Sequence, residues 1–297
     1  SRMFPRVLES SSLFRGAGEA MVARLMVRMA RRLVRAVPGQ CIIQEGSFGD
    51  EMYVLKSGAV EVAAYDQRLG GPRQLQVLGR GTCFGEVSLV MDARRTTTVR
   101  AMDYCELFVL SRADLEEVLA RHPESRFAVN ASAISPMLRN PAICPAIEGI
   151  SPEDSDRLGR RFALQPVTLH DGEVVLGAGE AAGCAFLLRS GVVAVEAACL
   201  HGGDGAGGVT GSLLYGGYAG SRQGRIRSEP RCFGLVELLS RRRCLWTVRA
   251  KGTVSGFQVE GEDLEELFSG SLQQERAMRR FMLLSKSLWL RERSTQA

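Results

Sequence analysis

The segment from Gly81 to Ala101, GTCFGEVSLVMDARRTTTVRA, combines three residue types that could bind a small anion. Gly85 has no side chain, so a backbone N–H can approach an anion closely there, and the residues after it suit a short helical turn with free N–H groups. Arg95 offers a planar fork of donors that matches two phosphate oxygens. Glu86, an acceptor when ionised, suits a sugar hydroxyl. The spacing predicts a ligand with one phosphate charge beside a ribose hydroxyl.

The chain contains a second copy of the elements around this segment. Four residues of an early block recur at a constant separation: Gly39, Gly46, Ser57 and Gly58 return as Gly172, Gly179, Ser190 and Gly191. The TVRA ending also recurs, and such repeats indicate two copies of one structural unit. We predict two domains, residues 1–139 and 140–297. The second contains an additional glycine-rich stretch, residues 201–224, which we interpret as a mobile loop and not a fold element.

The second copy lacks the groups that would contact a phosphate. Leu235 stands where Glu86 stands, Cys244 replaces Arg95, and Leu245 replaces Thr96. Arg243 aligns with Arg94, and Trp246 follows. Burying a phosphate among apolar side chains without charged partners is prohibitively costly. We therefore predict one binding site, in the first copy. The second copy is then a structural partner, an acceptor of the signal, or a site for an uncharged ligand.

The hydrophobic pattern predicts a mainly β fold with flanking helices. Short apolar or alternating runs separated by glycine turns indicate a closed antiparallel barrel or jelly roll, here two tandem β-rolls. The expected strands are residues 41–43, 52–55, 60–64, 75–78 and 105–110. The expected helices are residues 19–32, residues 112–120 capped by Ser111, a helix opening at Pro123, one starting at Ser151, and a C-terminal stretch, 271–293, with one apolar stripe.

Composition narrows the class of protein. The 297 residues are 45% hydrophobic and 24% charged, which fits packed cores and a polar surface. No apolar run is long enough to span a membrane. The eight cysteines form no C-x-x-C pair, so we expect reduced, mostly buried thiols and a cytoplasmic location. The three histidines have no metal-ligand spacing, and we expect no metal.

Basic residues are concentrated in two places. Arg241–Arg243 form a triplet. Five arginines lie in or near the first helical stretch: Arg24, Arg28, Arg31, Arg32 and Arg35. A nucleic-acid patch is one interpretation of such clusters. With a net charge of only +5, we favour solvated surfaces and expect no nucleic-acid partner.

The motif FGE-x-x-L followed by Arg95 resembles the phosphate-binding cassette of the cyclic nucleotide-binding domain family. The upstream stretch PG-x-x-I-x-x-EG-x-x-G-x-x-MYVL-x-x-G-x-V-EV resembles the start of that family's barrel. The resemblance covers Leu13 to about Phe127, and more weakly Ile150 to Phe268. It implies that Glu86 holds the ribose 2′-OH and Arg95 the cyclic phosphate. The implied ligand-binding set is Phe84, Gly85, Glu86, Val87, Ser88, Arg94, Arg95, Thr96 and Thr97.

The resemblance leaves the base open. Thr96 could bond the 2-amino group of a syn guanine, yet related channels with this threonine prefer cAMP, so cAMP and cGMP both remain. Val77 and Phe127 are candidates to contact the base or close over it, and Trp246 and Trp289 are further candidates for the lid. The RRTTTVRA ending is closer to gated ion channels, whereas the tandem arrangement is similar to regulatory subunits of cAMP-dependent kinase and to cGMP-dependent kinase.

These observations predict a receptor and no enzyme. One cyclic nucleotide per chain would bind the first copy, without a cofactor, and reorient the helices from Arg112 to about Asn130 toward the second copy or an effector. The sequence does not identify that effector. The alternative is a pseudo-receptor that binds a nucleoside or only a protein partner. A metal-dependent double-barrel enzyme would need a His/His/Glu cluster, which this sequence lacks. A DNA-binding regulator would need a recognition helix, and none is evident.

Overall fold

The structure, a computed structural model, describes residues 8, 11–66, 70–140, 143–147, 149–197, 212–216 and 231–268. The chain divides into two compact units, Ser1–Ala133 and Ile134–Ala297. The division falls within helix α5 (Arg126–Leu138), a few residues before the predicted domain boundary at 139. The assignment of a domain to each unit remains a prediction.

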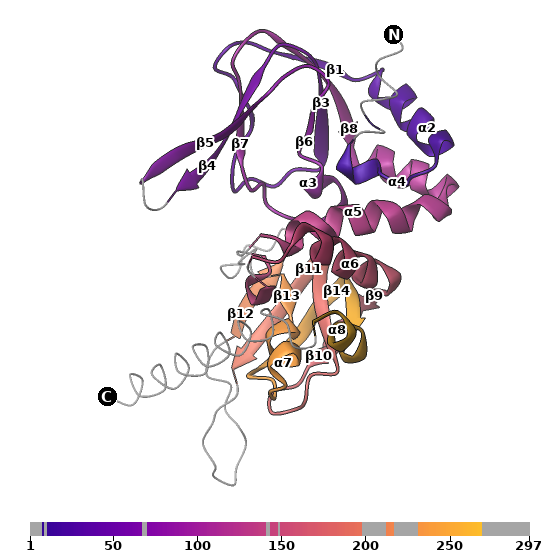
Figure 1. The fold of residues 1–297 in the computed structure, drawn as a ribbon, viewed down its shortest axis with the longest axis vertical. Coiled ribbons are helices and arrows are strands. Elements are labelled where there is room, and N and C mark those ends of the chain that lie inside the picture. Colours follow the sequence, from indigo (N-terminus) through magenta and orange to yellow (C-terminus); the bar gives the residue numbers. More distant parts are fainter. Residues whose placement is uncertain are drawn as a thin grey trace. The chain divides into compact units, whose positions relative to one another are not determined.

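Two four-stranded antiparallel sheets form the first unit (Figure 1). One has the order β1-β8-β3-β6 and the other the order β2-β7-β4-β5. The strands are β1 (Leu33–Ala36), β2 (Cys41–Ile43), β3 (Glu51–Ser57), β4 (Val60–Asp66), β5 (Gly71–Leu78), β6 (Cys83–Phe84), β7 (Thr98–Ala101) and β8 (Cys105–Ser111). This order is that of a jelly roll. A mainly β fold with flanking helices is therefore confirmed.

The core of the first unit lies between its two sheets. Alternate side chains of the strands point inward, and Leu55, Val62 and Val99 are at most 5% exposed. The turn from β3 to β4 needs Gly58, which has a φ of +90°, and an added Cβ there would lie 2.7 Å from the carbonyl oxygen of Tyr104. The glycine turns of the sequence thus set where strands end.

The second unit repeats these strand pairings with fewer, longer strands. Its long strands β11 (Cys184–Ala197) and β14 (Trp246–Glu260) pair along nearly their whole length. The N-terminal half of β11 pairs with β13 (Cys232–Phe233), as β3 pairs with β6. Strands β9 (Pro166–Leu169) and β10 (Val174–Leu176) both pair with β14, as β1 and β2 pair with β8 and β7.

The glycine-rich stretch 201–224 contains a strand, which corrects our prediction. Residues Ser212–Gly216 form β12 and pair with the C-terminal half of β11. This is the pairing that β5 makes with β4 in the first unit. The strand was missed because its apolar residues Leu213, Leu214 and Tyr215 are surrounded by glycines, which have low strand propensity. The rest of the stretch lies outside the described residues, as does the predicted apolar stripe at 271–293.

Helices flank both rolls. They are η1 (Ser12–Phe14), α2 (Glu19–Met29), α3 (Val87–Val90), α4 (Arg112–Arg121), η2 (Pro123–Ser125), α5, η3 (Pro145–Ile147), α6 (Pro152–Leu164), α7 (Leu235–Ser240) and α8 (Gly261–Phe268). The caps of α4 and α6 are confirmed, because Ser111 accepts from the backbone N–H of Asp114 at 3.2 Å and Ser151 from that of Asp154 at 3.0 Å.

The first long helix ends earlier than predicted. Helix α2 stops at Met29, and the chain turns into β1 at Leu33, where we had expected helix up to Arg32. Two arginines of this basic stretch form ion pairs: Arg28 on α2 with Asp114 at 3.1 Å, and Arg35 on β1, which stays 80% exposed, with Glu106 at 3.3 Å. These ion pairs attach α2 and β1 to the rest of the unit.

The remaining predictions concern thiols and membranes. Seven cysteines are described and all are free, three of them buried and four partly buried; Cys199 is not described. Within the described residues, no helix is long and apolar enough to cross a bilayer.

Candidate functional site

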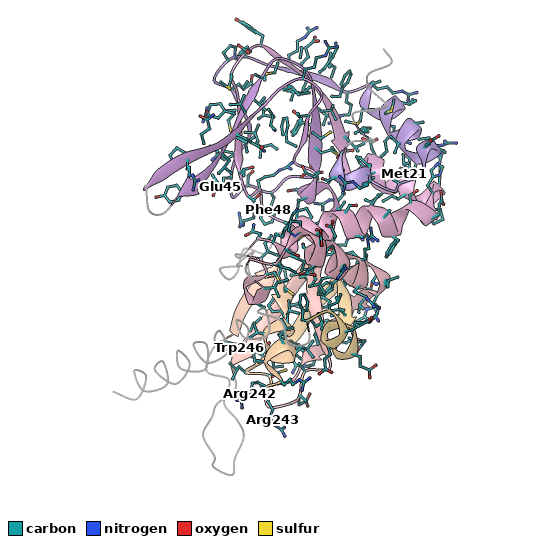
Figure 2. All side chains as sticks on the ribbon, in the orientation of Figure 1. Met21, Glu45, Phe48, Arg242, Arg243 and Trp246 are labelled. Atoms are coloured by element: carbon teal, nitrogen blue, oxygen red, sulfur yellow. The ribbon has the colours of Figure 1, made fainter. Side chains whose placement is uncertain are left out.

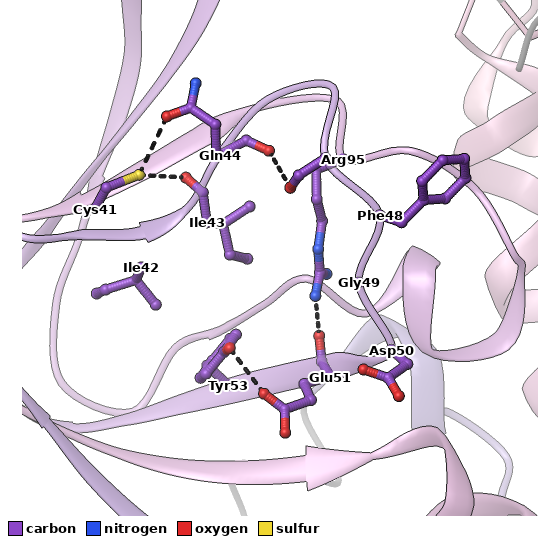
Figure 3. Close-up of a pocket in the computed structure, with 11 residues that line it drawn as sticks. Cys41, Ile42, Ile43, Gln44, Phe48, Gly49, Asp50, Glu51, Tyr53 and Arg95 are labelled. Carbon is purple, nitrogen blue, oxygen red and sulfur yellow. Dashed lines mark hydrogen bonds between the residues drawn. The ribbon is translucent and has the colours of Figure 1, made fainter. Parts of the chain in front are cut away.

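Arg95 is the buried cation at the centre of the candidate site. Its backbone is fixed on both sides, since its N–H donates to Ser47 O and its C=O accepts from Gly46 N, both at 2.8 Å. The side chain is only 7% exposed. Its guanidinium donates to the carbonyl oxygen of Gly85 at 2.8 Å. It also donates to that of Glu51 at 2.5 Å, as Figure 3 shows. Burial lowers the pKa of Arg95, which shows how poorly water reaches the charge.

Two glycines make room for this guanidinium. A Cβ at Gly85 would lie 2.7 Å from Nη1 of Arg95, and the φ of Gly85 is +83°. A Cβ at Gly49 would overlap the guanidinium group itself. The sequence predicted that the missing side chain of Gly85 lets an anion approach the backbone. The structure gives that missing side chain a further role. It accommodates the arginine in addition to any anion.

A pocket of about 480 Å³ opens beside Arg95. Its wall comes mostly from β2, the loop after it and the start of β3, as Figure 3 shows. The lining residues are Cys41, Ile42, Ile43, Gln44, Ser47, Phe48, Gly49, Asp50, Glu51, Tyr53 and Arg95. Of the predicted ligand-binding set, only Arg95 lines it. The upstream EG-x-x-G-x-x-MY pattern was the signal for this loop, but we had interpreted it as barrel framework.

Glu86 is the second charged group of the site. It immediately precedes α3 and is partly buried. Burial raises the pKa of its carboxyl, while its own backbone N–H and the charge of Arg95 act in the opposite direction. An acid and a guanidinium are thus both held in a poorly solvated part of the first unit. Titratable groups whose pKa is shifted by burial and by a nearby charge are common at functional sites.

The other predicted cassette residues serve the framework or face solvent. The guanidinium of Arg94 lies 4.3 Å from the ring centroid of Phe48, which Figure 2 labels, and donates to Gly46 O at 2.6 Å. Phe84 is 5% exposed and stacks on Tyr53 at 5.4 Å. Ser88 is buried. Val87 and Thr97 are partly buried and Thr96 is exposed.

The two candidates for contact with the base are both partly solvent-exposed. Val77 on β5 is 49% exposed, and Phe127 on α5 is 40% exposed. Neither lines the pocket beside Arg95. Their roles remain predictions. No group of three His, Cys, Asp or Glu side chains suited to a metal ion occurs among the described residues.

In the second unit an apolar cluster occupies the corresponding place. Leu235 is 1% exposed and Cys244 is 4% exposed, and Cys244 packs with Leu176, Val248 and other core side chains. Arg243 donates to Gly179 O at 2.8 Å, which repeats the bond from Arg94 to Gly46 O. Arg243 is therefore the counterpart of Arg94 and does not replace Arg95.

One family match covers the region that holds the site. The model of the cyclic nucleotide-binding domain matches residues 33–122. The human cyclic nucleotide-gated channel alpha-2 is 37% identical over 112 residues, 35% of this chain and 16% of the channel. The bovine channel beta-1 is 34% identical over 140 residues, 45% of this chain and 9% of the channel. The matched part thus spans less than a fifth of these relatives.

The structure also resembles solved proteins. The regulatory domain of Toxoplasma gondii PKA, crystallised with cAMP, is 19% identical, with a TM-score of 0.39 over 97% of this chain and 95% of that one. The N-terminal domain of a Streptomyces coelicolor transcriptional regulator is 30% identical, with a TM-score of 0.38 over 45% of this chain and 92% of that one. Residues 33–122, which match the family model of the cyclic nucleotide-binding domain, include Glu51, Glu86 and Arg95.

Proposed function

We propose that this protein is a receptor for a cyclic nucleotide, cAMP or cGMP, which binds the first unit at one site per chain. The observation that carries the proposal is the state of Arg95. Among the described residues, the hydrogen-bond acceptors of its guanidinium are two main-chain carbonyl oxygens and no carboxylate. The carboxylates of Asp50, Glu51 and Glu86 act on its charge without a hydrogen bond to it. A phosphate would supply the direct charge-assisted contact that this buried guanidinium lacks.

Glu86 gives the ligand its second feature. A dianionic phosphate ester would repel this carboxylate, whereas a cyclic phosphate carries one charge and leaves the ribose 2′-OH free to donate. An ionised Glu86 accepts that hydroxyl, as the family resemblance implies. The combination of a buried arginine and a buried acid therefore favours a nucleotide with its phosphate closed on the ribose. The relatives named above are gated by such nucleotides according to their names.

A path from the cassette to the helices supports a relay of the signal. Arg112, the first residue of α4, donates from Nη2 to Ser88 O at 2.6 Å and to Met91 O at 3.2 Å, and from Nε to Leu89 O at 3.2 Å. Its backbone N–H donates to Asp50 O, at the pocket, at 2.7 Å. A ligand that moves the cassette would change these bonds and shift α4 and the helices after it, through its differential affinity for the two arrangements.

We further propose that the second unit is a tandem domain of the same type that does not bind the ligand. The repeated strand pairings and the Arg243 bond support a common framework. Leu235 and Cys244, which fill the place of Glu86 and Arg95, support the loss of binding. A cytoplasmic location and the absence of catalysis complete the proposal.

Isothermal titration calorimetry of cAMP and cGMP tests this function. We expect one ligand per chain. Charge-assisted hydrogen bonds contribute about 1.5–3 kcal/mol each, so Arg95→Ala should lose at least about 3 kcal/mol of binding free energy with an unchanged circular dichroism spectrum. Arg243→Ala is the matched control and should bind as the parent does. Two ligands per chain would contradict the proposal for the second unit, and an Arg95→Ala protein that binds like the parent would contradict the phosphate contact.

A further inference from the structure

Glu51 is held at both ends, and one end holds Arg95. Its main-chain carbonyl oxygen accepts from Nη2 of Arg95 at 2.5 Å, as Figure 3 shows. Its carboxylate is shared between two donors: Nη2 of Arg32 at 2.8 Å and the hydroxyl of Tyr53 at 3.0 Å. The backbone of Glu51 is already paired with Ser111 on β8, and the two side-chain contacts restrain the same residue further.

Both partners are themselves fixed. Arg32 lies between α2 and β1, and its carbonyl oxygen accepts from Val109 N, on β8, at 3.0 Å. The Tyr53 ring stacks on Phe84. Burial, helped by the charge of Glu51, raises the pKa of Tyr53 to about 12. The hydroxyl therefore stays protonated and donates a hydrogen bond to Glu51. Glu51 is thus held by Tyr53 on its own strand, β3, and by Arg32, the residue before β1.

The second unit shows which residues stand in the same places. The bond from Val109 N to Arg32 O reappears as one from Gln258 N to Gln165 O at 2.9 Å. The pairing of Glu51 with Ser111 reappears as Cys184 with Glu260, and that of Tyr53 with Phe84 as Phe186 with Phe233. The four polar residues Arg32, Glu51, Tyr53 and Arg95 therefore correspond to Gln165, Cys184, Phe186 and Cys244.

All four polar groups differ together in this chain. The aromatic pair is kept in the second unit, but the hydroxyl that serves Glu51 is absent from Phe186. The bond that Arg94 makes is kept by Arg243. A general role in holding a β-roll together would not require Arg32, Glu51 and Tyr53 to disappear where Arg95 does. Their joint replacement links them to the arginine and not to the fold.

We propose that Arg32, Glu51 and the Tyr53 hydroxyl are positioning residues that hold the Arg95 guanidinium ready for the phosphate. The proposal rests on the function proposed above. A free arginine side chain loses much rotamer freedom when it is fixed by a ligand. A guanidinium already fixed through the Glu51 carbonyl loses less, and affinity rises accordingly.

Three variants remove the set without touching Arg95. Arg32→Ala deletes the cation, Tyr53→Phe installs the residue type of the second unit, and Glu51→Gln keeps the carbonyl while removing the charge. Each should weaken cyclic nucleotide binding by about three- to tenfold, the range expected for one side chain losing its preorganisation. Arg32→Lys should recover part of the loss. Arg35→Ala, which breaks the neighbouring ion pair with Glu106, is the matched control and should leave affinity unchanged.

A second measurement does not depend on ligand. In nitrogen-15 NMR of the parent protein, the Nε–Hε signal of Arg95, assigned with Arg95→Lys, should show slow exchange with water, and Arg32→Ala and Tyr53→Phe should accelerate it. Unchanged affinity and unchanged exchange in these variants would overturn the proposal, as would an Arg35→Ala protein that loses as much affinity. If the parent binds neither cAMP nor cGMP, the proposed function fails, and the exchange rates alone decide whether the set positions Arg95.

Discussion

The two units share a framework and differ in what it surrounds. Thr98 accepts from Glu45 N at 3.1 Å in the first, and Thr247 accepts from Ala178 N at 3.2 Å in the second. Arg100 donates to Gly39 O at 2.7 Å, and Arg249 donates to Gly172 O at the same distance. These bonds join turns to strands in both rolls and belong to the fold. The second unit buries Arg231 and Glu237, so the comparison shows that this roll forms without a charge at the position of Arg95.

The interiors show what replaces that charge. In the first unit a glycine-lined space holds the Arg95 guanidinium, whereas Cys244 in the second packs into an apolar cluster. The first arrangement keeps a desolvated cation, which costs stability. The second gains apolar burial instead. The comparison therefore contrasts a position that keeps a costly buried charge, which we propose serves binding, with one that is packed into the apolar core.

Installing the missing arginine is the strongest challenge to this contrast. Cys244→Arg places a guanidinium among Leu176, Val248 and their neighbours, where an uncompensated buried charge should cost about 3–5 kcal/mol of unfolding free energy. Both tryptophans lie in residues 134–297, so urea denaturation followed by tryptophan fluorescence monitors this unit. Cys244→Ala is the control and should lose only about 1 kcal/mol. A folded Cys244→Arg protein of parental stability that binds a second cyclic nucleotide would show that the second framework is still competent.

The C-terminal ends of the short helices α3 and α7 are stabilised in different ways, and a second prediction tests this difference. Arg112 bonds the last carbonyls of α3, whereas Gly261 stands at its position in the second unit. There, Arg241 ends α7 locally with a left-handed φ of 51°. Arg112→Ala leaves three buried carbonyls without their donor and should lower the unfolding free energy of the first unit by about 1.5–3 kcal/mol.

The measurement for this variant is amide hydrogen exchange. Protection should fall for residues 87–91 and, through the Asp50 contact, around the pocket. Affinity for the cyclic nucleotide should fall as well, because the cassette is no longer held to α4. Arg241→Ala is the matched control and should affect only the second unit. Unchanged exchange at 87–91 in the Arg112→Ala protein would show that α3 does not depend on α4.

The sequence predicted more of the fold than of the site. Strand β2 has its expected bounds, and β3, β4, β5 and β8 each extend the predicted run by one to several residues. The glycines marked the turns between these strands, because a positive φ strongly favours glycine. Strand β1 was missed because its side chains do not alternate between apolar and polar. Leu33 and Val34 are adjacent apolar residues, and both are exposed, by 37% and 41%. It forms through pairing with β8, a contact that local sequence cannot show.

The sequence could single out candidate side chains of the site, whose roles remain proposals. Glu86 and Arg95 were identified by residue type and spacing. The groups that hold Arg95 are main-chain carbonyls of Gly85 and Glu51, and a carbonyl is present whatever the residue. Arg112 also escaped notice, because it was assigned only to a helix start. Its role depends on α3 lying beside that start, which is a tertiary fact.

The smallest expected effects come from two buried acids, one in each unit. Burial raises the pKa of Glu86 and also of Glu237, on α7, from the ordinary value of 4.5. Ionisation is therefore costlier in the folded state, so each acid destabilises its unit at neutral pH, and the penalty vanishes below pH 4.5, where folded and unfolded chains are both protonated. Replacing either by glutamine should raise the unfolding free energy by about 1 kcal/mol at pH 7 and leave it unchanged at pH 4.

The two substitutions should differ in their effect on affinity for the cyclic nucleotide. Glu86→Gln loses the charge on the ribose hydroxyl and should weaken cyclic nucleotide binding by about 1 kcal/mol, whereas Glu237→Gln should leave it intact. Calorimetry at pH 7, together with urea denaturation at pH 4 and pH 7, measures both quantities on the same proteins. A gain in stability without a loss of affinity in Glu86→Gln would leave Glu86 as a buried acid like Glu237. The difference between the units would then rest on Arg95 and the residues that hold it.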